Sequence, residues 1–367
     1  MSDLKNLGQK GLDELIASLN EKPYRAHQLY RWIYKRGAAS FDDMTDVSKG
    51  FREMMKGRFT ISHPNITETD ESSDGTRKLL LELDDGNCIE SVIIPEEKRV
   101  TLCISTQVGC PLDCGFCVTG RGGFIRNLRL SEMINQVHAA KLLLSDDKPI
   151  TNLVLMGMGE PLLNYEEVKR FLDIATDQSG LAFAPRRVTV STAGIVPLIE
   201  RLGRETKVML AISLNGATDE VRSHLMPINR KYPLKTLMEA CRRYGSGKKR
   251  VITFEYILIK GVNDGQEDAR KVAALLHKIP CKINLIPFNP FPGSTFTRPA
   301  RGTILQFQQI LIGKGYTTFL RESRGDEIRA ACGQLRGRLL KEKRVDPPDS
   351  LPLNLLKLEE RQKNIPA

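Results

Sequence analysis

Three cysteines stand close together in the segment GCPLDCGFC of this 367-residue sequence, at Cys110, Cys114 and Cys117. Thiolates at such spacing bind zinc or an iron–sulfur cluster, and counting the ligands separates the two. A structural zinc site needs four closed ligands, yet no second CxxC and no HxxxH supplies a fourth, and the five histidines are scattered. Three cysteines on a four-iron cluster leave one iron without a protein ligand, open to a substrate or cofactor.

The elements that must position this cysteine triplet alternate between strand and helix. We expect apolar strands at 100–105, 152–156, 187–192, 208–214, 251–258 and 282–287, and helices near 131–144, 165–177, 196–202, 233–244, 264–278 and 303–312. Such alternation predicts a parallel sheet that is buried on both faces. A doubly wound sheet and an open, partial (β/α) barrel both fit. In either case the site belongs at the carboxyl ends of the strands.

Other parts of the sequence predict smaller units around this core. Helical patterns lie at 12–19, 23–36 and 48–56, and the last two carry basic residues. The apolar runs 78–83 and 88–94 flank the turn sequence DDGN, which indicates a hairpin. We therefore divide the chain into an N-terminal helical accessory domain that binds RNA (1–65), a β-hairpin extension (66–95), a core (96–325) and a C-terminal segment with a basic tail (326–367).

Composition narrows the class of protein. The chain is 41% hydrophobic, which supports a sizeable core, and no stretch approaches the roughly 18 uninterrupted apolar residues of a membrane span. Eight cysteines, three of them crowded together, favour metal ligands or catalysts in a reducing compartment over a secreted disulfide framework. The formal net charge of +11 indicates a polyanionic partner, of which nucleic acid is the commonest. We expect a cytoplasmic protein.

Polar residues and glycines stand where the predicted strands end. The segment MGMGEP follows the second strand, and further polar groups follow the third, fourth and sixth strands. Each of them alone fits a capping or turn residue equally well. As a set at one edge of a parallel sheet, they are candidates for binding a cofactor. The candidates are Gly159, Glu160, Ser191, Ser213, Leu214, Asn215 and Asn289.

Several motifs together resemble one known family. The triplet has the CxxxCxΦC form of the radical SAM superfamily, with Phe116 as the aromatic residue. The segments MGMGEPLLN, RRVTVSTAG, CKINLIPFNPFPG and RGDEIRAACGQL, with CISTQVGCPLDCGFC and GGFIRNL, resemble the RlmN family of adenine-C2 RNA methyltransferases. The resemblance extends over almost the whole chain, from EKPYRAHQ to CGQL. It implies that the core is a partial (β/α)6 TIM-like radical SAM barrel.

The resemblance also implies the cofactors. One [4Fe-4S] cluster would be bound by Cys110, Cys114 and Cys117, and its open iron would chelate S-adenosyl-L-methionine, which the strand-end candidates would help to hold. An electron from the cluster then cleaves the sulfonium to give a 5′-deoxyadenosyl radical. Two molecules of S-adenosyl-L-methionine would be used per turnover. The family commonly has histidine where this chain has Asn215, so the role of that side chain is open.

Three further residues receive roles from the resemblance. Cys332 matches the cysteine that is methylated first and then passes its methyl group to the base. Cys103 matches the thiol that releases the RNA by forming a disulfide with it, and Glu90 matches the base that removes the proton from carbon 2. Without the resemblance, Cys332 would be an ordinary thiol and Glu90 an outward-facing strand residue. Cys88, Cys241 and Cys281 keep that interpretation.

The sequence thus predicts a methyltransferase that acts on carbon 2 of adenosine in 23S rRNA and in the anticodon loop of tRNA. The expected partners are these RNAs and an electron donor such as flavodoxin, with no membrane and a monomeric chain. One alternative is methylation at carbon 8, as in the related Cfr enzymes, because the cysteines are the same for both. Another, from a different class, is a non-catalytic RNA-binding protein stapled by zinc.

Overall fold

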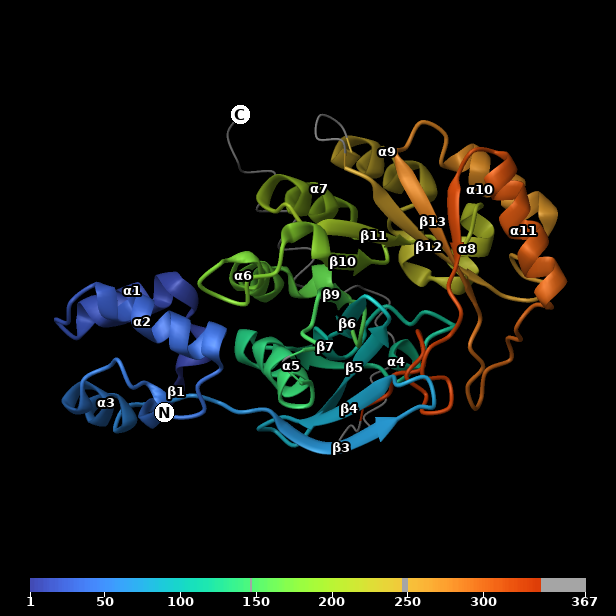
Figure 1. The fold of residues 1–367 in the computed structure, drawn as a ribbon. Helices are drawn as coiled ribbons and strands as arrows, with labels where there is room; N and C mark the ends of the chain where they lie inside the picture. The colour runs from blue at the N-terminus through green and yellow to red at the C-terminus, as the bar shows by residue number, and fades with distance from the viewer. Residues whose placement is uncertain (146, 246–249, 338–367) are drawn as a thin grey trace.

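The computed structural model describes residues 1–145, 147–245 and 250–337. A ten-stranded sheet runs through it in the order β14-β13-β12-β11-β10-β9-β6-β5-β4-β3 (Figure 1). From β6 to β14 every pairing is parallel. These parallel strands are β6 (Arg99–Cys103), β9 (Asn152–Leu155), β10 (Val188–Thr192), β11 (Met209–Ser213), β12 (Ile252–Leu258), β13 (Cys281–Pro287) and β14 (Thr317–Leu320). The six predicted strands are all present, so the predicted α/β class is confirmed.

Helices lie around the outside of the curved parallel part of the sheet (Figure 1). They are α5 (Leu130–Leu142), α6 (Tyr165–Thr176), α7 (Val196–Glu205), α8 (Asp219–Leu225), α9 (Leu234–Gly245), α10 (Gln266–Leu275) and α11 (Arg301–Gly313). Each of α6 and α7 turns one apolar stripe inward; on α6 it includes Val168, Phe171 and Leu172, all buried. Burying one such side chain stabilises the fold by roughly 1.5–3 kcal/mol. The sheet stays open between β14 and β3, which gives a partial barrel.

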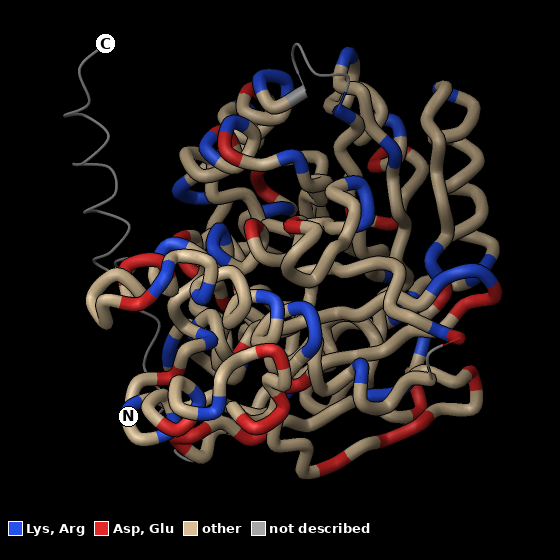
Figure 2. Tube along the Cα trace, turned by 60° about the vertical axis from the view of Figure 1, so that its left-hand side comes forward, with Lys and Arg blue, Asp and Glu red and all other residues tan. Residues whose placement is uncertain are grey.

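The sheet continues beyond β6 as an antiparallel extension made of β3 (Asn65–Glu71), β4 (Arg77–Glu82) and β5 (Cys88–Glu96). The predicted hairpin corresponds to β4 and β5. The outer strand β3 was not predicted because its sequence, NITETDE, is polar and mostly exposed. Acidic residues lie along this outer strand (Figure 2), and charge on an edge strand discourages pairing with another chain.

The N-terminal helices α1 (Gly8–Ser18), α2 (Tyr24–Tyr30) and α3 (Lys49–Lys56) match the three predicted ones. A π-helical turn, Arg31–Arg36, continues α2. Leu12, Ile16 and Leu29 are buried in these helices and belong to the same apolar cluster as the core of the barrel. A short parallel pair, β1 (Ser2–Asp3) with β2 (Phe59–Thr60), joins the two ends of the helical unit.

A buried lysine ties the helical unit to α5 of the barrel. Lys5 is 1% exposed, and its Nζ donates to the carbonyl of Ser62 and to Asn135 Oδ1, each at 2.6 Å. It also lies 3.3 Å from His138 Nδ1. Burial lowers the pKa of Lys5 to about 8 and that of His138 to about 3, so the imidazole is neutral beside the ammonium group. This contact holds the N-terminal helices against the core.

Two further observations concern membrane-spanning helices and the C-terminal tail. In the described part of the chain, no helix is both long and apolar enough to cross a membrane. Most of the predicted basic tail, from residue 338 onward, lies outside the described residues.

Candidate active site

The cysteine triplet lies in a loop framed by a small ribbon. Strand β7 (Gln107–Gly109) pairs with β8 (Phe124–Asn127), and the short helix α4 (Val118–Arg121) follows the third cysteine. The backbone N–H of Cys110 donates to the Gly123 carbonyl at 2.8 Å, and that of Cys117 to the Cys114 carbonyl at 3.0 Å. Gly109 has φ +75°, and a Cβ there would come within 2.0 Å of the Gly123 oxygen, so only glycine fits. The loop geometry is therefore set locally.

The three thiols share one protein environment. Cys114 is buried, and Cys110 and Cys117 are half-buried. Burial raises the pKa of Cys110 and of Cys114, and electrostatic interactions among the three cysteines add to the rise. As free thiols, Cys110 and Cys114 stay protonated, and they become thiolates only when a cation compensates their charge. This donor set fits an iron–sulfur cluster.

The geometry also bears on the kind of metal group. Among residues 1–145, 147–245 and 250–337, no three His, Cys, Asp or Glu side chains are arranged to hold one metal ion. A single zinc ion needs its sulfur ligands to converge within about 2.3 Å of one point. Cysteines on a four-iron cluster do not need to converge in this way, because each binds a different iron.

A buried arginine that the sequence did not single out lies beside the triplet. Arg222 of α8 is fully buried, and its guanidinium donates to the carbonyls of Leu214 and Ser213, at 3.0 and 3.3 Å, and to that of Ala193. Burial lowers the pKa of Arg222 to about 10, and electrostatic interaction with Cys114 opposes this shift. The residue thus joins the ends of β10 and β11 and places a positive charge near the thiols. In the sequence, DEVRSHL gave no signal of burial.

Glu160 and the glycine before it form a close-packed turn after β9. The Glu160 carboxylate is 3% exposed and accepts from the N–H groups of Leu162 at 3.1 Å and Ala193 at 2.7 Å. Burial raises the pKa of this carboxyl to about 7. Gly159 has φ +98°, and a Cβ there would lie 2.5 Å from Gln107 Cβ. The MGMGEP segment therefore brings the end of β9 against both β7 and β10.

The remaining strand-end candidates lie at the same edge of the sheet. Ser191 is in β10, Ser213 ends β11, and both Leu214 and Asn289 are buried just beyond strand ends. Asn215, at φ +54°, uses its side chain within the protein: Oδ1 accepts from the N–H of Ile257 at 2.8 Å, and Nδ2 lies 3.3 Å from Met226 Sδ. A contact between Asn215 and a cofactor stays a prediction.

The described part of the C-terminal segment, together with the three residues before it (323–337), crosses this edge of the sheet, and the name refers to these residues from here on. Asn289 Nδ2 donates to the Cys332 carbonyl at 3.3 Å, which links the segment to the end of β13. On the other side, the N–H of Val118 donates to the Gly333 carbonyl at 2.7 Å, directly after the last cysteine of the triplet. Thr119 Oγ1 donates to the Leu335 carbonyl at 2.6 Å. The fold thus lays Cys332 next to the triplet loop.

The same crossing brings Cys332 near Cys103 at the end of β6. Cys103 is buried and Cys332 is exposed; all eight cysteines lie in the described part of the chain, and each is a free thiol. Burial raises the pKa of Cys103 to about 12, and electrostatic interactions with Cys332 and Glu255 add to the rise. Glu255, a buried carboxylate within β12, was missed, although a glutamate inside the apolar run ITFEYIL is the kind of signal that indicates a site.

Glu90 of β5 faces the segment from the side of the antiparallel extension. It is 7% exposed, and its Oε2 accepts from the N–H groups of Arg336 at 2.7 Å and Gly337 at 3.3 Å. The interpretation of Glu90 as an outward-facing strand residue is therefore wrong. Of the cysteines without an assigned role, Cys88 and Cys241 are buried and Cys281 is half-buried, as expected for packing residues.

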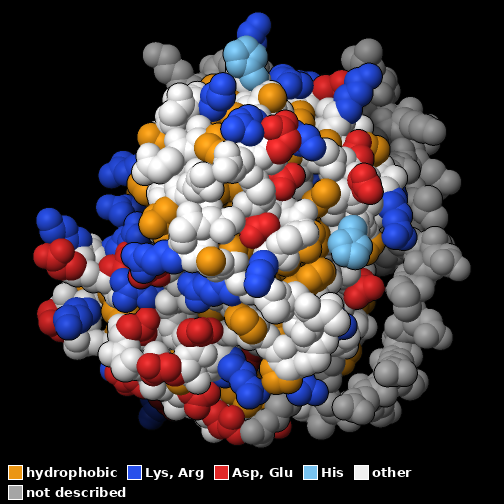
Figure 3. Space-filling model, turned by 90° about the vertical axis from the view of Figure 1, so that its right-hand side faces the viewer, with side chains coloured by type: hydrophobic (Ala, Val, Ile, Leu, Met, Phe, Trp, Pro, Cys, Tyr) orange, Lys and Arg blue, Asp and Glu red, His pale blue; other side chains and the backbone are white. Residues whose placement is uncertain are grey.

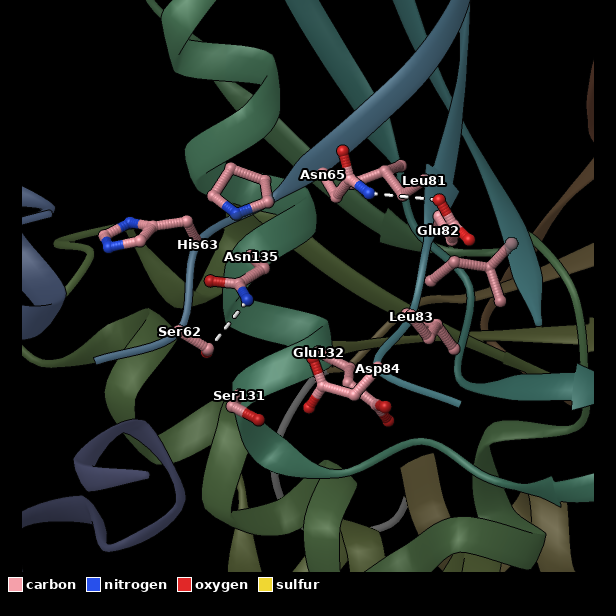
Figure 4. A pocket seen from close by; sticks show the side chains of 12 residues that line it. Ser62, His63, Asn65, Leu81, Glu82, Leu83, Asp84, Ser131, Glu132 and Asn135 are labelled. Carbon is pink, nitrogen blue, oxygen red and sulfur yellow. Dashed lines mark hydrogen bonds between the residues drawn. The ribbon is translucent and has the colours of Figure 1, made fainter. Parts of the chain in front are cut away.

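A separate pocket lies away from these residues, between the 62–65 segment, the β4–β5 hairpin and α5 (Figure 4). Its polar side chains bond to one another: Asn135 Nδ2 donates to Ser62 Oγ at 3.0 Å, and Asn65 Nδ2 donates to Glu82 Oε2 at 3.1 Å (Figure 4). None of the predicted site residues lines it. The pocket belongs to the joint between the N-terminal helices and the core.

Comparison with known proteins agrees with this geometry. Residues 104–273 match the radical SAM superfamily, and residues 2–61 match the ribosomal RNA large subunit methyltransferase N-terminal domain. The dual-specificity RNA methyltransferase RlmN of Syntrophus aciditrophicus is 48% identical over 93% of this chain and 98% of its own length. The protein of the same name from Geobacter sulfurreducens is 49% identical over 92% of this chain and 93% of its own length.

A solved structure also matches this chain over most of its length. The crystal structure of a radical SAM methyltransferase from Sphaerobacter thermophilus has a TM-score of 0.86 and 42% identity, and the match covers 92% of this chain and 99% of that one. The chain belongs to the RlmN family of the radical SAM superfamily.

Proposed function

We propose that this chain is a radical SAM methyltransferase that methylates carbon 2 of adenosine in 23S rRNA and in tRNA. The observation that carries the proposal is the path of the C-terminal segment. It places Cys332 beside the triplet loop, within electrostatic range of Cys103, and continues to residues that bond to Glu90. Residues from distant parts of the sequence meet at one edge of the sheet, as a reaction that uses a cysteine to carry a methyl group requires.

The cysteine triplet would hold a [4Fe-4S] cluster, and the strand-end residues would hold S-adenosyl-L-methionine, two molecules being consumed per turnover. When bound, this pair of cofactors supplies a 5′-deoxyadenosyl radical. The protein's contribution is to hold the cofactor at the carboxyl ends of the strands, where Glu160, Ser191 and Ser213 stand. Radical chemistry suits carbon 2, which is electron-poor and has no lone pair with which to attack a sulfonium methyl group.

The chain's own residues then share the remaining steps. Cys332 carries the methyl group as S-methylcysteine, in a segment that crosses the carboxyl edge of the sheet. Glu90 accepts the proton from carbon 2 of the adduct. The Cys103 thiolate attacks the sulfur of Cys332: an S–S bond forms, the bond between that sulfur and the methylene carbon breaks, and the carbon keeps the electron pair and takes up a proton, so that methylated RNA is released and a disulfide remains. Because thiolates are the nucleophiles, the high pKa of Cys103 keeps this thiol unreactive until a base takes its proton. Glu255 is near enough to Cys103 to interact with it electrostatically.

The RNA partners are supported by charge as well as by family. The chain carries a formal net charge of +11, and Figure 3 shows Lys and Arg side chains in a band across the middle of one face, among acidic ones. Such cations bind phosphates without regard to sequence. The target base would leave its stack to reach the segment that carries Cys332. A flavodoxin-like electron donor, a monomeric state and a cytoplasmic location belong to the same proposal.

Nucleoside mass spectrometry tests this function. We expect 2-methyladenosine in 23S rRNA and in tRNA from cells that carry the gene, and its absence from cells that lack it. Appearance of 8-methyladenosine instead would favour carbon-8 chemistry. Anaerobic reconstitution followed by iron, sulfide and zinc analysis gives an independent check, since one tightly held zinc and no iron would overturn the cluster.

A further inference from the structure

Lys78 of β4 makes three contacts that no family motif points to. Its Nζ donates to the Ile328 carbonyl at 2.7 Å, and it lies 3.3 Å from Asp70 Oδ2 and 3.5 Å from Glu90 Oε1. An ammonium group has three N–H donors, and these three oxygens come from β3, β5 and the C-terminal segment. The Lys78 side chain is only 14% exposed. The geometry is that of a fixed contact and not of a surface lysine.

Together, Lys78 and Glu90 hold the C-terminal segment on both sides of Cys332. Lys78 bonds to Ile328, four residues before the cysteine, and Glu90 bonds to the N–H groups of Arg336 and Gly337, which follow it. The ion pair between Lys78 and Glu90, on the antiparallel extension, therefore holds the C-terminal segment both before and after Cys332.

The β3–β4 turn makes further contacts with the part of the C-terminal segment that precedes Cys332. Ser73 Oγ donates to Glu327 Oε1 at 2.8 Å, and the N–H of Gly325 donates to Asp74 Oδ2 at 3.2 Å. These groups are more exposed than Lys78 and Glu90, so water competes with their bonds. The contribution of the buried pair is the larger one.

The pairing also leaves part of the Glu90 carboxylate without a hydrogen bond from the protein. Both N–H groups donate to Oε2, and the Lys78 ammonium group lies 3.5 Å from Oε1 as an ion pair. Oε1 can therefore still contact a substrate group. Without the ammonium group, the buried carboxylate would lose its charge partner, and breaking a buried pair in this way strongly destabilises the arrangement around it.

We propose that Lys78 is a positioning residue of the reaction: it docks the C-terminal segment, and with it Cys332, onto the extension next to Glu90. This inference rests on the proposed function of Cys332 and Glu90. It gives the antiparallel extension a role in the chemistry, as the platform on which the cysteine that carries the methyl group is held.

Hydrogen–deuterium exchange of the full chain tests the docking. Lys78→Met keeps the aliphatic stem and removes the charge, and Lys78→Arg keeps the charge; Lys98→Met, at an exposed lysine in the β5–β6 turn, is the matched control. We expect Lys78→Met to speed exchange across residues 325–337 by about tenfold or more, since hydrogen bonds to a charged group are lost, with little change in Lys78→Arg and Lys98→Met. Equal exchange in Lys78→Met and Lys98→Met would overturn the docking role.

Kinetics of the reconstituted enzyme separate positioning from loss of structure. We expect kcat for RNA methylation to fall about tenfold or more in Lys78→Met, while KM for RNA changes less than about twofold, and Lys78→Arg to recover most of kcat. Faster exchange with an unchanged kcat would refute the positioning role. If the wild-type enzyme makes no 2-methyladenosine, the proposed function fails, whereas the exchange result still reports whether Lys78 docks the segment.

Discussion

The chain contains two sets of cysteines with proposed functions, and the fold positions them in opposite ways. Cys110, Cys114 and Cys117 lie in one loop, held by backbone bonds within the β7–β8 ribbon. Cys103 and Cys332 come from the first parallel strand and from the last described segment, and only the fold brings them together. Ligands for a metal group can be encoded by local spacing, whereas a disulfide between thiols from distant segments depends on the topology of the whole sheet.

The two sets also differ in what supports them. The triplet loop depends mostly on glycines and short-range bonds, with one bond from the Gly115 N–H to the distant Leu225 carbonyl. The position of Cys332 depends on Asn289, Val118 and the extension, which are far apart in sequence. Mutation should therefore separate cofactor binding from methyl transfer.

The largest effect is expected from the triplet. Cys114→Ala should abolish both cluster assembly and RNA methylation, because the remaining two cysteines cannot hold roughly four irons. Iron and sulfide content after anaerobic reconstitution measures this, with circular dichroism to check that the fold is retained. A variant that keeps its full iron content would show that the triplet is not the ligand set. Cys241→Ala, at a buried cysteine outside the site, is the matched control.

The next effect should fall on methyl transfer alone. Cys332→Ala should lower RNA methylation by more than about a thousandfold, since the carrier is lost, while iron content stays at the wild-type level. Nucleoside mass spectrometry and iron analysis of the same sample give both values. An active Cys332→Ala enzyme would break the distinction between the two cysteine sets.

A more specific effect is expected at the other member of the pair. Cys103→Ala should trap RNA on the protein through Cys332, because no thiol remains to attack that sulfur. Denaturing gel electrophoresis should show one RNA-linked band that nuclease removes, and the double variant with Cys332→Ala should lack it. Free methylated RNA formed at the wild-type rate would rule out a resolving role for Cys103.

The smallest effect concerns the surroundings of the triplet. Burial raises the pKa of Glu160 from 4.5 to about 7. At pH values between these two, the Glu160 carboxyl keeps its proton in the folded protein but has lost it in the unfolded chain. The stability from this group is present below about pH 4.5 and is lost as the pH rises through about 7. We expect Glu160→Gln to flatten the pH dependence of unfolding of the cluster-free protein between pH 5 and 8 by about 2–3 kcal/mol.

Chemical unfolding at several pH values measures this difference, and Glu97→Gln in the exposed β5–β6 turn serves as the control. Parallel curves for the wild type and Glu160→Gln would show that the carboxylate is not held in its neutral form.

The two cysteine sets also mark what could be predicted from the sequence. The six strands and the triplet were predicted because apolar runs and close spacing are local signals. Strand β14 was missed because TTFL is short and alternately exposed, and α8 because its seven residues show only a weak pattern. Arg222 could not be predicted as buried, because arginine is almost never fully buried unless its N–H donors are satisfied. In the folded chain its donors are satisfied by groups that only the tertiary structure brings together. The roles of Cys332 and Glu90 were reached only through family resemblance.

The pairing of β5 with β6 has a consequence for how the site can change over evolution. Val92 lies opposite Cys103 in this antiparallel pair, and Glu90 is two residues from Val92 on the same strand, so Glu90 and Cys103 belong to the same face of the sheet. An insertion of one residue between positions 90 and 92 would turn the carboxylate to the other face while the thiol stayed in place. This short stretch of β5 therefore keeps Glu90, the proposed base, on the same face of the sheet as the Cys103 thiol.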